Sequence, residues 1–96
     1  PMAIYSVSDI TVKDAEAYKE YMEKAAPLVE KFGGRYLVRG GEVTPGEGAW
    51  TPSRVVILEF PDDESMVAFR TSPEYAPVGE IRHRAADTKS FKVEGV

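Results

Sequence analysis

The stretch "YLVRGGEVTPGEGAWTPSRVVILEF", residues 36–60, decides how the fold is read. Two apolar runs, about 35–40 and about 54–60, flank a loop rich in glycine and proline, which is longer than the usual hairpin connection. The second run is apolar at successive positions instead of alternating. A strand that is apolar on both sides indicates a sheet whose two faces are both covered. Each run also carries one charge, Arg39 and Glu59, which could face inward.

The segments before this stretch predict a strand and then a helix. Residues 3–9 alternate between two sides, which is typical of a strand with one more polar face. Between Asp14 and Gly33, apolar side chains recur at spacings of three and four, so they form one stripe of a helix. Asp14 can cap the start of this helix, and Gly33 or Gly34 can end it.

The segments after it predict short helices and a last strand. Asp62 can cap a first helix, and Ser72 can cap a second one that begins at "SPEY". We expect Pro77 to begin a further helical segment. The last strand is expected at about 87–94, with Phe91 and Val93 pointing inward.

The order of elements is therefore β-α-β-β-α-β. Right-handed connections applied to this order predict a single α+β domain over residues 1–96: a ferredoxin-like, four-stranded antiparallel sheet with its helices on one face. No helix is left to cover the second face, and the simplest cover is the same face of another copy. We therefore expect a homodimer that joins through its sheet faces and the 40–53 loop, with Trp50 buried by the partner. Arg39 or Glu59 could line a cavity at or near that interface.

Composition excludes several classes of protein. The chain has 96 residues, a net charge of −4 and no cysteine. An acidic chain without a basic patch argues against a nucleic-acid partner. The lack of cysteine excludes disulfides and thiolate chemistry. No apolar run is long enough to span a membrane, so we expect a soluble, cytoplasmic protein without a membrane partner.

Several pieces of the chain resemble a known family of small bacterial proteins, the domain of unknown function family 1330. They are "VRGG" at the end of the second strand, the W-x-P-x-R pattern before the third, "EF" at its end, and "SPEY". The resemblance covers nearly the whole chain and implies a dimeric α/β barrel. Relatives in that superfamily include cofactor-free monooxygenases, dehydratases and chlorite-degrading haem proteins, so the fold does not determine the function.

Arg39 and Glu59 are the first candidates for a site. Arg39 could bind a carboxylate through both arms of its guanidinium. Glu59 could be a general base whose pKa is raised by burial. The alternative is that each makes a structural salt bridge or hydrogen bond at a strand end.

Four further residues are candidates with structural alternatives. Tyr75 could contact a ligand at a pocket edge or fill the core with its ring. Ser72 could contact a ligand, but its role as a helix cap needs no chemistry. Tyr18 lies in the apolar helical stripe, so it is either a core residue or a ligand contact. His83, the only histidine, could be a general base or an exposed helix residue. A metal site would have to combine His83 with carboxylates alone, and nothing else in the sequence supports haem ligation by His83.

The main functional hypothesis is that the protein binds a small anionic or aromatic molecule without a cofactor. The alternative is a cofactor-free enzyme of the monooxygenase or lyase type. A third hypothesis follows from Pro1, whose free secondary amine could act as the base of a tautomerase, unless Pro1 is a remnant of a tag.

Overall fold

The computed structural model describes residues 2–96, so Pro1 and the tautomerase hypothesis that depends on it lie outside the described residues. The elements are β1 (Ile4–Val12), α1 (Ala15–Lys31), β2 (Arg35–Arg39), β3 (Val55–Phe60), α2 (Asp63–Thr71), α3 (Tyr75–Ala85) and β4 (Ala86–Glu94). The predicted order is confirmed, with the second helical region divided into α2 and α3. No helix within residues 2–96 is long and apolar enough to cross a membrane.

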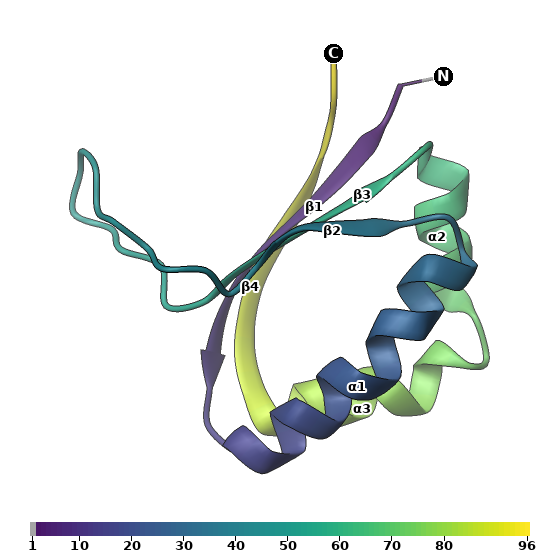
Figure 1. The fold of residues 1–96 in the computed structure, drawn as a ribbon, viewed down its shortest axis with the longest axis horizontal. Helices are drawn as coiled ribbons and strands as arrows, with labels where there is room; N and C mark the ends of the chain where they lie inside the picture. The colour runs from purple at the N-terminus through teal and green to yellow at the C-terminus, as the bar shows by residue number, and fades with distance from the viewer. Residues whose placement is uncertain (1) are drawn as a thin grey trace.

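The four strands form one antiparallel sheet in the order β2-β3-β1-β4. The three helices lie on the same side of this sheet, and the sheet curves around them (Figure 1). This arrangement confirms the predicted ferredoxin-like fold. It leaves one sheet face toward the helices and the opposite face, called here the outer face, without a helix.

The helices begin and end where the sequence indicates. Asp14 Oδ1 accepts a hydrogen bond from the backbone N–H of Ala17 at 3.1 Å, and Asp62 Oδ1 accepts one from that of Ser65 at 2.8 Å. Both carboxylates thus satisfy N–H groups that have no partner inside the helix. After α1, Gly33 has a φ of 86°, a left-handed conformation that glycine adopts without steric cost.

Ser72 lies between α2 and α3, and its Oγ accepts a hydrogen bond from the backbone N–H of Tyr75 at 3.1 Å. Ser72 thus makes the hydrogen bond expected of a cap, although α3 itself begins three residues later, at Tyr75. The prediction that Pro77 begins a separate segment is wrong, because Pro77 lies in the first turn of α3. The first turn has no intrahelical acceptors for its N–H groups, so a proline there breaks no helical hydrogen bond.

The core fills the space between the helices and the helix-facing side of the sheet. Its largest fully buried side chains are Phe60, Phe69 and Val29. The rings of Phe60 and Phe69 lie 5.5 Å apart between centroids, and those of Phe69 and Tyr75 lie 4.6 Å apart. This aromatic cluster fixes α2 and the start of α3 against β3.

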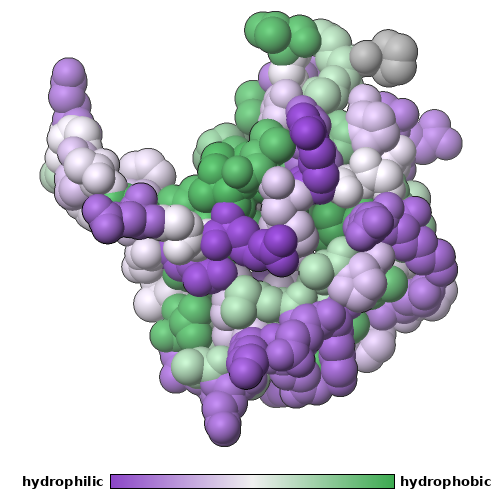
Figure 2. Space-filling model, in the orientation of Figure 1, coloured by the Kyte–Doolittle hydropathy of each residue, from purple (hydrophilic) through white to green (hydrophobic). Residues whose placement is uncertain are grey.

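The outer face is apolar and exposed in the single chain. Every second residue of β1 is buried toward the helices, beginning with Ile4, so Tyr5 and Val7 face outward. Val93 pairs with Tyr5 and Phe91 pairs with Val7, which places both on the outer face. They are 47% and 59% exposed, so the prediction that they point into the core is wrong. Figure 2 shows hydrophobic surface gathered over the strands on this side.

Residues 40–54 form an arm that leaves the body of the molecule between β2 and β3 (Figure 1). The end of the arm nearer β3 is held by Asp9, which accepts hydrogen bonds from the backbone N–H of Ser53 at 2.8 Å and from Trp50 Nε1 at 3.3 Å. Trp50 is nevertheless 64% exposed in the single chain. A large exposed aromatic beside an apolar face is typical of a protein interface.

Candidate functional site

A β-bulge in β2 determines where Arg39 points. Tyr36 pairs with Leu58 of β3, and Arg39 pairs with Val56, with a register shift between Tyr36 and Val38. Leu58 and Val56 face the helices. Residues three apart in a regular strand lie on opposite faces, but the extra residue of the bulge brings Tyr36 and Arg39 to the same face.

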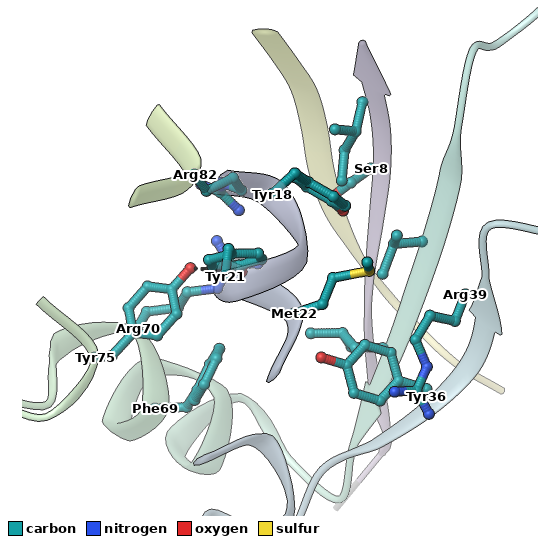
Figure 3. A pocket seen from close by; sticks show the side chains of 13 residues that line it. Ser8, Tyr18, Tyr21, Met22, Tyr36, Arg39, Phe69, Arg70, Tyr75 and Arg82 are labelled. Atoms are coloured by element: carbon teal, nitrogen blue, oxygen red, sulfur yellow. Dashed lines mark hydrogen bonds between the residues drawn. The ribbon is translucent and has the colours of Figure 1, made fainter. Parts of the chain in front are cut away.

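This face borders a narrow cavity between the sheet and the helices (Figure 3). Its lining side chains are Ser8, Ile10, Tyr18, Tyr21, Met22, Tyr36, Arg39, Val56, Leu58, Phe69, Arg70, Tyr75 and Arg82. The cavity has a free volume of about 30 Å³, which is enough for only a few water molecules. Arg39 therefore faces the helices and not the space between two sheets, which the sequence had suggested for Arg39 or Glu59.

The charged side chains that line this cavity are all arginines. Arg39, Arg70 and Arg82 come from three different elements, β2, α2 and α3. Within residues 2–96, none of the three makes an ion pair with a carboxylate. The guanidinium carbon of Arg39 lies 4.1 Å from the ring centroid of Tyr36, so the cation rests on an aromatic face. The cavity is thus electropositive.

Arg70 and Arg82 have hydrogen-bonding capacity that the chain does not use. Arg70 Nη2 donates to Ser6 Oγ at 2.8 Å, and Arg82 Nη2 lies 3.4 Å from His83 Nε2. The Nε atoms of both arginines are buried without a hydrogen-bond partner among the described residues. Buried donors of this kind are unusual in folded proteins and call for an acceptor.

A pair of tyrosine hydroxyls completes one end of the cavity. The hydroxyl oxygens of Tyr21 and Tyr75 lie 3.0 Å apart. Burial, reinforced by the neighbouring Tyr75, raises the pKa of Tyr21 above its ordinary value. Tyr21 therefore stays protonated at neutral pH. The guanidinium carbon of Arg82 lies 5.8 Å from the Tyr21 ring, so the hydroxyl pair and this arginine are neighbours.

The structure brings three of the predicted site residues together and holds a fourth beside them. Arg39, Tyr18 and Tyr75 all line the cavity. Ser72 does not line it, because its hydroxyl donates to the carbonyl oxygen of Phe69 at 3.0 Å while accepting from the backbone of Tyr75. Ser72 thereby positions Tyr75 at the start of α3.

Glu59 lies on the outer face, opposite the side that carries Arg39. Its carboxylate accepts hydrogen bonds from Arg35 Nε at 2.6 Å and from the Tyr5 hydroxyl at 2.9 Å. The bond from Arg35, followed by that from Tyr5, holds the pKa of Glu59 below its ordinary value. This pKa contradicts the hypothesis of a general base whose pKa is raised by burial, and the alternative, a structural salt bridge and hydrogen bond, is what Glu59 makes. Arg39 and Glu59 do not share a cavity.

His83 lies on the exposed side of α3, outside the cavity. Its Nδ1 is 3.7 Å from Glu80 Oε1, one helical turn earlier. His83 is therefore an exposed helix residue, which was the alternative to its role as a general base. Among residues 2–96, no three His, Asp or Glu side chains converge so as to hold a metal ion.

Sequence reasoning did not name Arg70, Arg82, Tyr21 or Met22 as site residues, although all four line the cavity. A signal for the arginines does exist in the helices. Arg70 follows the buried Met66 by four residues, and Arg82 follows the buried Val78 by four. Residues four apart lie on the same side of a helix, so both arginines share the buried side of their helix. A charge at such a position indicates a polar site under the helix.

Comparison with solved structures agrees with this fold. The chain superposes on the RPA0582 protein of unknown function from Rhodopseudomonas palustris with a TM-score of 0.79 and 20% identity, covering 99% of this chain and 83% of that one. SnoaB, a cofactor-independent oxygenase from Streptomyces nogalater, gives 0.69 and 8% identity, covering 100% and 95%. A hypothetical protein from Arabidopsis thaliana gives 0.70 and 14% identity, covering 100% and 90%.

At these identities the superpositions support a shared fold and nothing finer. No curated protein matches the sequence. A family model, in contrast, matches residues 3–96, which is nearly the whole chain. The chain therefore belongs to the family described as Domain of unknown function (DUF1330).

Proposed function

We propose that the protein binds a small organic anion with an aromatic or apolar body in the cavity between sheet and helices. One observation carries the proposal: Arg39, Arg70 and Arg82 line the cavity and no carboxylate lines it with them. Like charges gathered in a partly desolvated space are unfavourable, and an anion would neutralise them. A guanidinium can also bind a carboxylate with two parallel hydrogen bonds.

The cavity must open to admit an organic ligand, because its free space is only about 30 Å³. Two of its walls are suited to move. Met22 has an unbranched, flexible side chain. Arg39 is exposed and rests on Tyr36 without any ion pair to a described residue, so its side chain can swing away at little cost. The ligand would then replace the tyrosine ring as the partner of Arg39.

Thermal unfolding with and without benzoate tests the proposal. At a ligand concentration of about 100 times Kd, binding should stabilise the fold by about 2.7 kcal/mol, which raises Tm by about 10–20 °C for a domain of this size. Arg39→Met keeps the apolar stem and removes the charge, so it should reduce this shift. Arg84→Met is the matched control, because Arg84 is exposed on α3 and does not line the cavity.

The proposal fails if no carboxylate of a broad panel stabilises the wild type. It also fails if Arg84→Met reduces the shift as much as Arg39→Met, since the effect would then report overall charge. If Arg39→Met does not fold, Arg39 has a structural role at the end of β2, which was the alternative to ligand binding, and the proposal fails for this residue.

We also propose a homodimer in which the outer faces of two copies pack together. A groove of about 390 Å³ on this face is lined mainly by apolar side chains, among them Val7, Trp50, Val55 and Phe91. Burying such a surface against its own copy would give both faces of the sheet a cover. Light scattering at micromolar concentration should give about twice 10.6 kDa, and a monomer would contradict the proposal. The cytoplasmic location stays a prediction.

A second candidate function is a cofactor-free enzyme of the monooxygenase or lyase type. The observation that favours it is the pair of Tyr21 and Tyr75 hydroxyls beside the cavity arginines. Protonated hydroxyls and a nearby cation can stabilise an oxyanion that develops on an enolate or phenolate. Because Glu59 and His83 lie outside the cavity, this proposal assigns the stabilising role to the tyrosines. Oxygen uptake with a panel of phenols and aromatic acids tests the monooxygenase type: turnover that Tyr75→Phe lowers supports it, and absence of oxygen uptake contradicts it. Loss of substrate in the same panel without oxygen uptake would indicate the lyase type.

A further inference from the structure

The arginines of the cavity stand at two separate ends. In Figure 3, Arg39 and Tyr36 lie on one side of the view, and Arg70, Tyr75 and Arg82 lie on the other, with Met22 between them. The first end belongs to β2, and the second is formed by side chains of α1, α2 and α3. The two ends are called here the strand end (Arg39 and Tyr36) and the helix end (Tyr21, Arg70, Tyr75 and Arg82).

We infer that the ligand carries two acidic groups on one short, flat, apolar body, so that one group binds at each end. This inference rests on the proposed function and narrows its ligand class from organic anions to organic dianions. A monoanion at the strand end would leave Arg70 and Arg82 without a counterion. A second acidic group on the same molecule would neutralise them at the same time.

The helix end is built to accept oxygen atoms. The Nε–H groups of Arg70 and Arg82 are buried without acceptors among the described residues. The hydroxyls of Tyr21 and Tyr75 bond to each other, yet each oxygen keeps a further hydrogen-bonding site. A carboxylate offers two acceptor oxygens with several lone pairs, so it can satisfy an arginine Nε–H and a tyrosine hydroxyl together.

The space between the ends suits an apolar ring. Apart from Ser8, the lining side chains that belong to neither end are apolar or aromatic, among them Met22, Val56 and Leu58. Tyr18 adds a buried aromatic wall. A polar linker would lose its hydration here without gaining hydrogen bonds, whereas a flat ring would lose little. The free volume of about 30 Å³ is smaller than one ring, so the opening that admits the ligand has the least to provide for a body of one ring.

Calorimetric titration with three probes of the same ring tests the inference: benzoate, isophthalate and terephthalate. The two dicarboxylates differ from benzoate by one added carboxylate at different positions, so they sample two separations of the acidic groups. We expect at least one of them to bind more than about tenfold more tightly than benzoate, with one molecule per protomer. Arg39→Met and Arg82→Met should each remove this preference, and Arg84→Met should leave it unchanged.

A second measurement uses the wild type alone, in case an arginine variant does not fold. In an NMR titration, the better dicarboxylate should shift the Nε–H resonances of Arg70 and Arg82 together with that of Arg39. Benzoate should shift only the resonances of one end.

The outcomes separate this inference from the proposed function. If benzoate binds as tightly as both dicarboxylates, the inference is wrong while the binding function stands. If two benzoates bind per protomer, the ends are independent and the inference is also wrong. If none of the three probes binds, the proposed function fails for aromatic carboxylates, and the inference fails with it.

Discussion

Removal of both hydroxyls from the pair of Tyr21 and Tyr75 should destabilise the fold by less than the sum of the two single removals. The two oxygens are 3.0 Å apart, and Tyr75 is only 6% exposed. Tyr75→Phe leaves the Tyr21 hydroxyl without its partner, and Tyr21→Phe does the same to Tyr75. A buried hydroxyl without a hydrogen bond costs about 1–3 kcal/mol. The double variant leaves no stranded hydroxyl, so its cost should be smaller than the sum of the two singles.

Thermal or urea unfolding at a fixed protomer concentration measures this effect. A loss of 2 kcal/mol lowers Tm by roughly 8–16 °C for a domain of about 100 residues. The coupling energy between the two sites should be about 0.5–3 kcal/mol. Tyr36→Phe is the matched control, because Tyr36 lines the same cavity and its hydroxyl makes no hydrogen bond to another described residue. Its stability should change by less than about 0.5 kcal/mol.

Additive costs for Tyr21→Phe and Tyr75→Phe would refute this reasoning. Additivity would mean that water reaches both hydroxyls in the folded protein and replaces the missing partner. The cavity would then be wetter than its free space of about 30 Å³ indicates. The assignment of the tyrosine pair to a dry, electropositive site would have to be given up.

Three further predictions follow from the outer face and the core. The pKa of Glu59 is lowered in the folded state, so the stabilisation from its hydrogen bonds is present above its unfolded pKa near 4.5 and is lost as the pH falls through the lower folded value. In a profile of unfolding free energy measured between pH 2 and pH 7, Glu59→Gln should therefore reduce the loss of stability at the acid end, and an unchanged loss would refute this. Trp50→Ala should weaken the homodimer by about 2–4 kcal/mol in sedimentation equilibrium, and an unchanged dissociation constant would show that Trp50 lies outside the interface. Gly34→Ala should lower the free energy of unfolding by about 1–3 kcal/mol, because the added methyl would lie 2.6 Å from the fully buried ring of Phe60. Gly41→Ala is the control: its added methyl would meet open space and should change the free energy of unfolding by less than about 0.5 kcal/mol, so equal effects of the two variants would contradict the packing argument.

The sequence alone determined the elements and the class of fold. Each helix and strand is specified by short-range features: the apolar stripe of α1, the caps Asp14 and Asp62, and the apolar run of β3. These features act over a few residues, so they can be read without knowing the rest of the chain. The order of elements then restricts the topology to a few choices, of which the ferredoxin-like sheet is the one observed.

The candidate site was only partly predictable. Arg39 and Tyr75 were identified from their places at a strand end and a helix start, and both line the cavity. Glu59 was identified by the same reasoning and lies on the other face. An alternating pattern states that neighbours in a strand point to opposite sides, but it does not state which side faces the helices when both are apolar.

Only the tertiary structure decided which charges meet. The bulge in β2 turns Arg39 toward the helices, and this bulge is a feature of the hydrogen bonding between β2 and β3 that no local pattern specifies. Arg70 and Arg82 are far from Arg39 in the chain, and they converge with it because α2 and α3 pack over the same sheet face. Phe91 and Val93 face outward because β4 pairs with β1 in a particular register. Side-chain periodicity is a local property of the chain, whereas register, bulges and the meeting of distant side chains depend on contacts between segments that are remote in sequence.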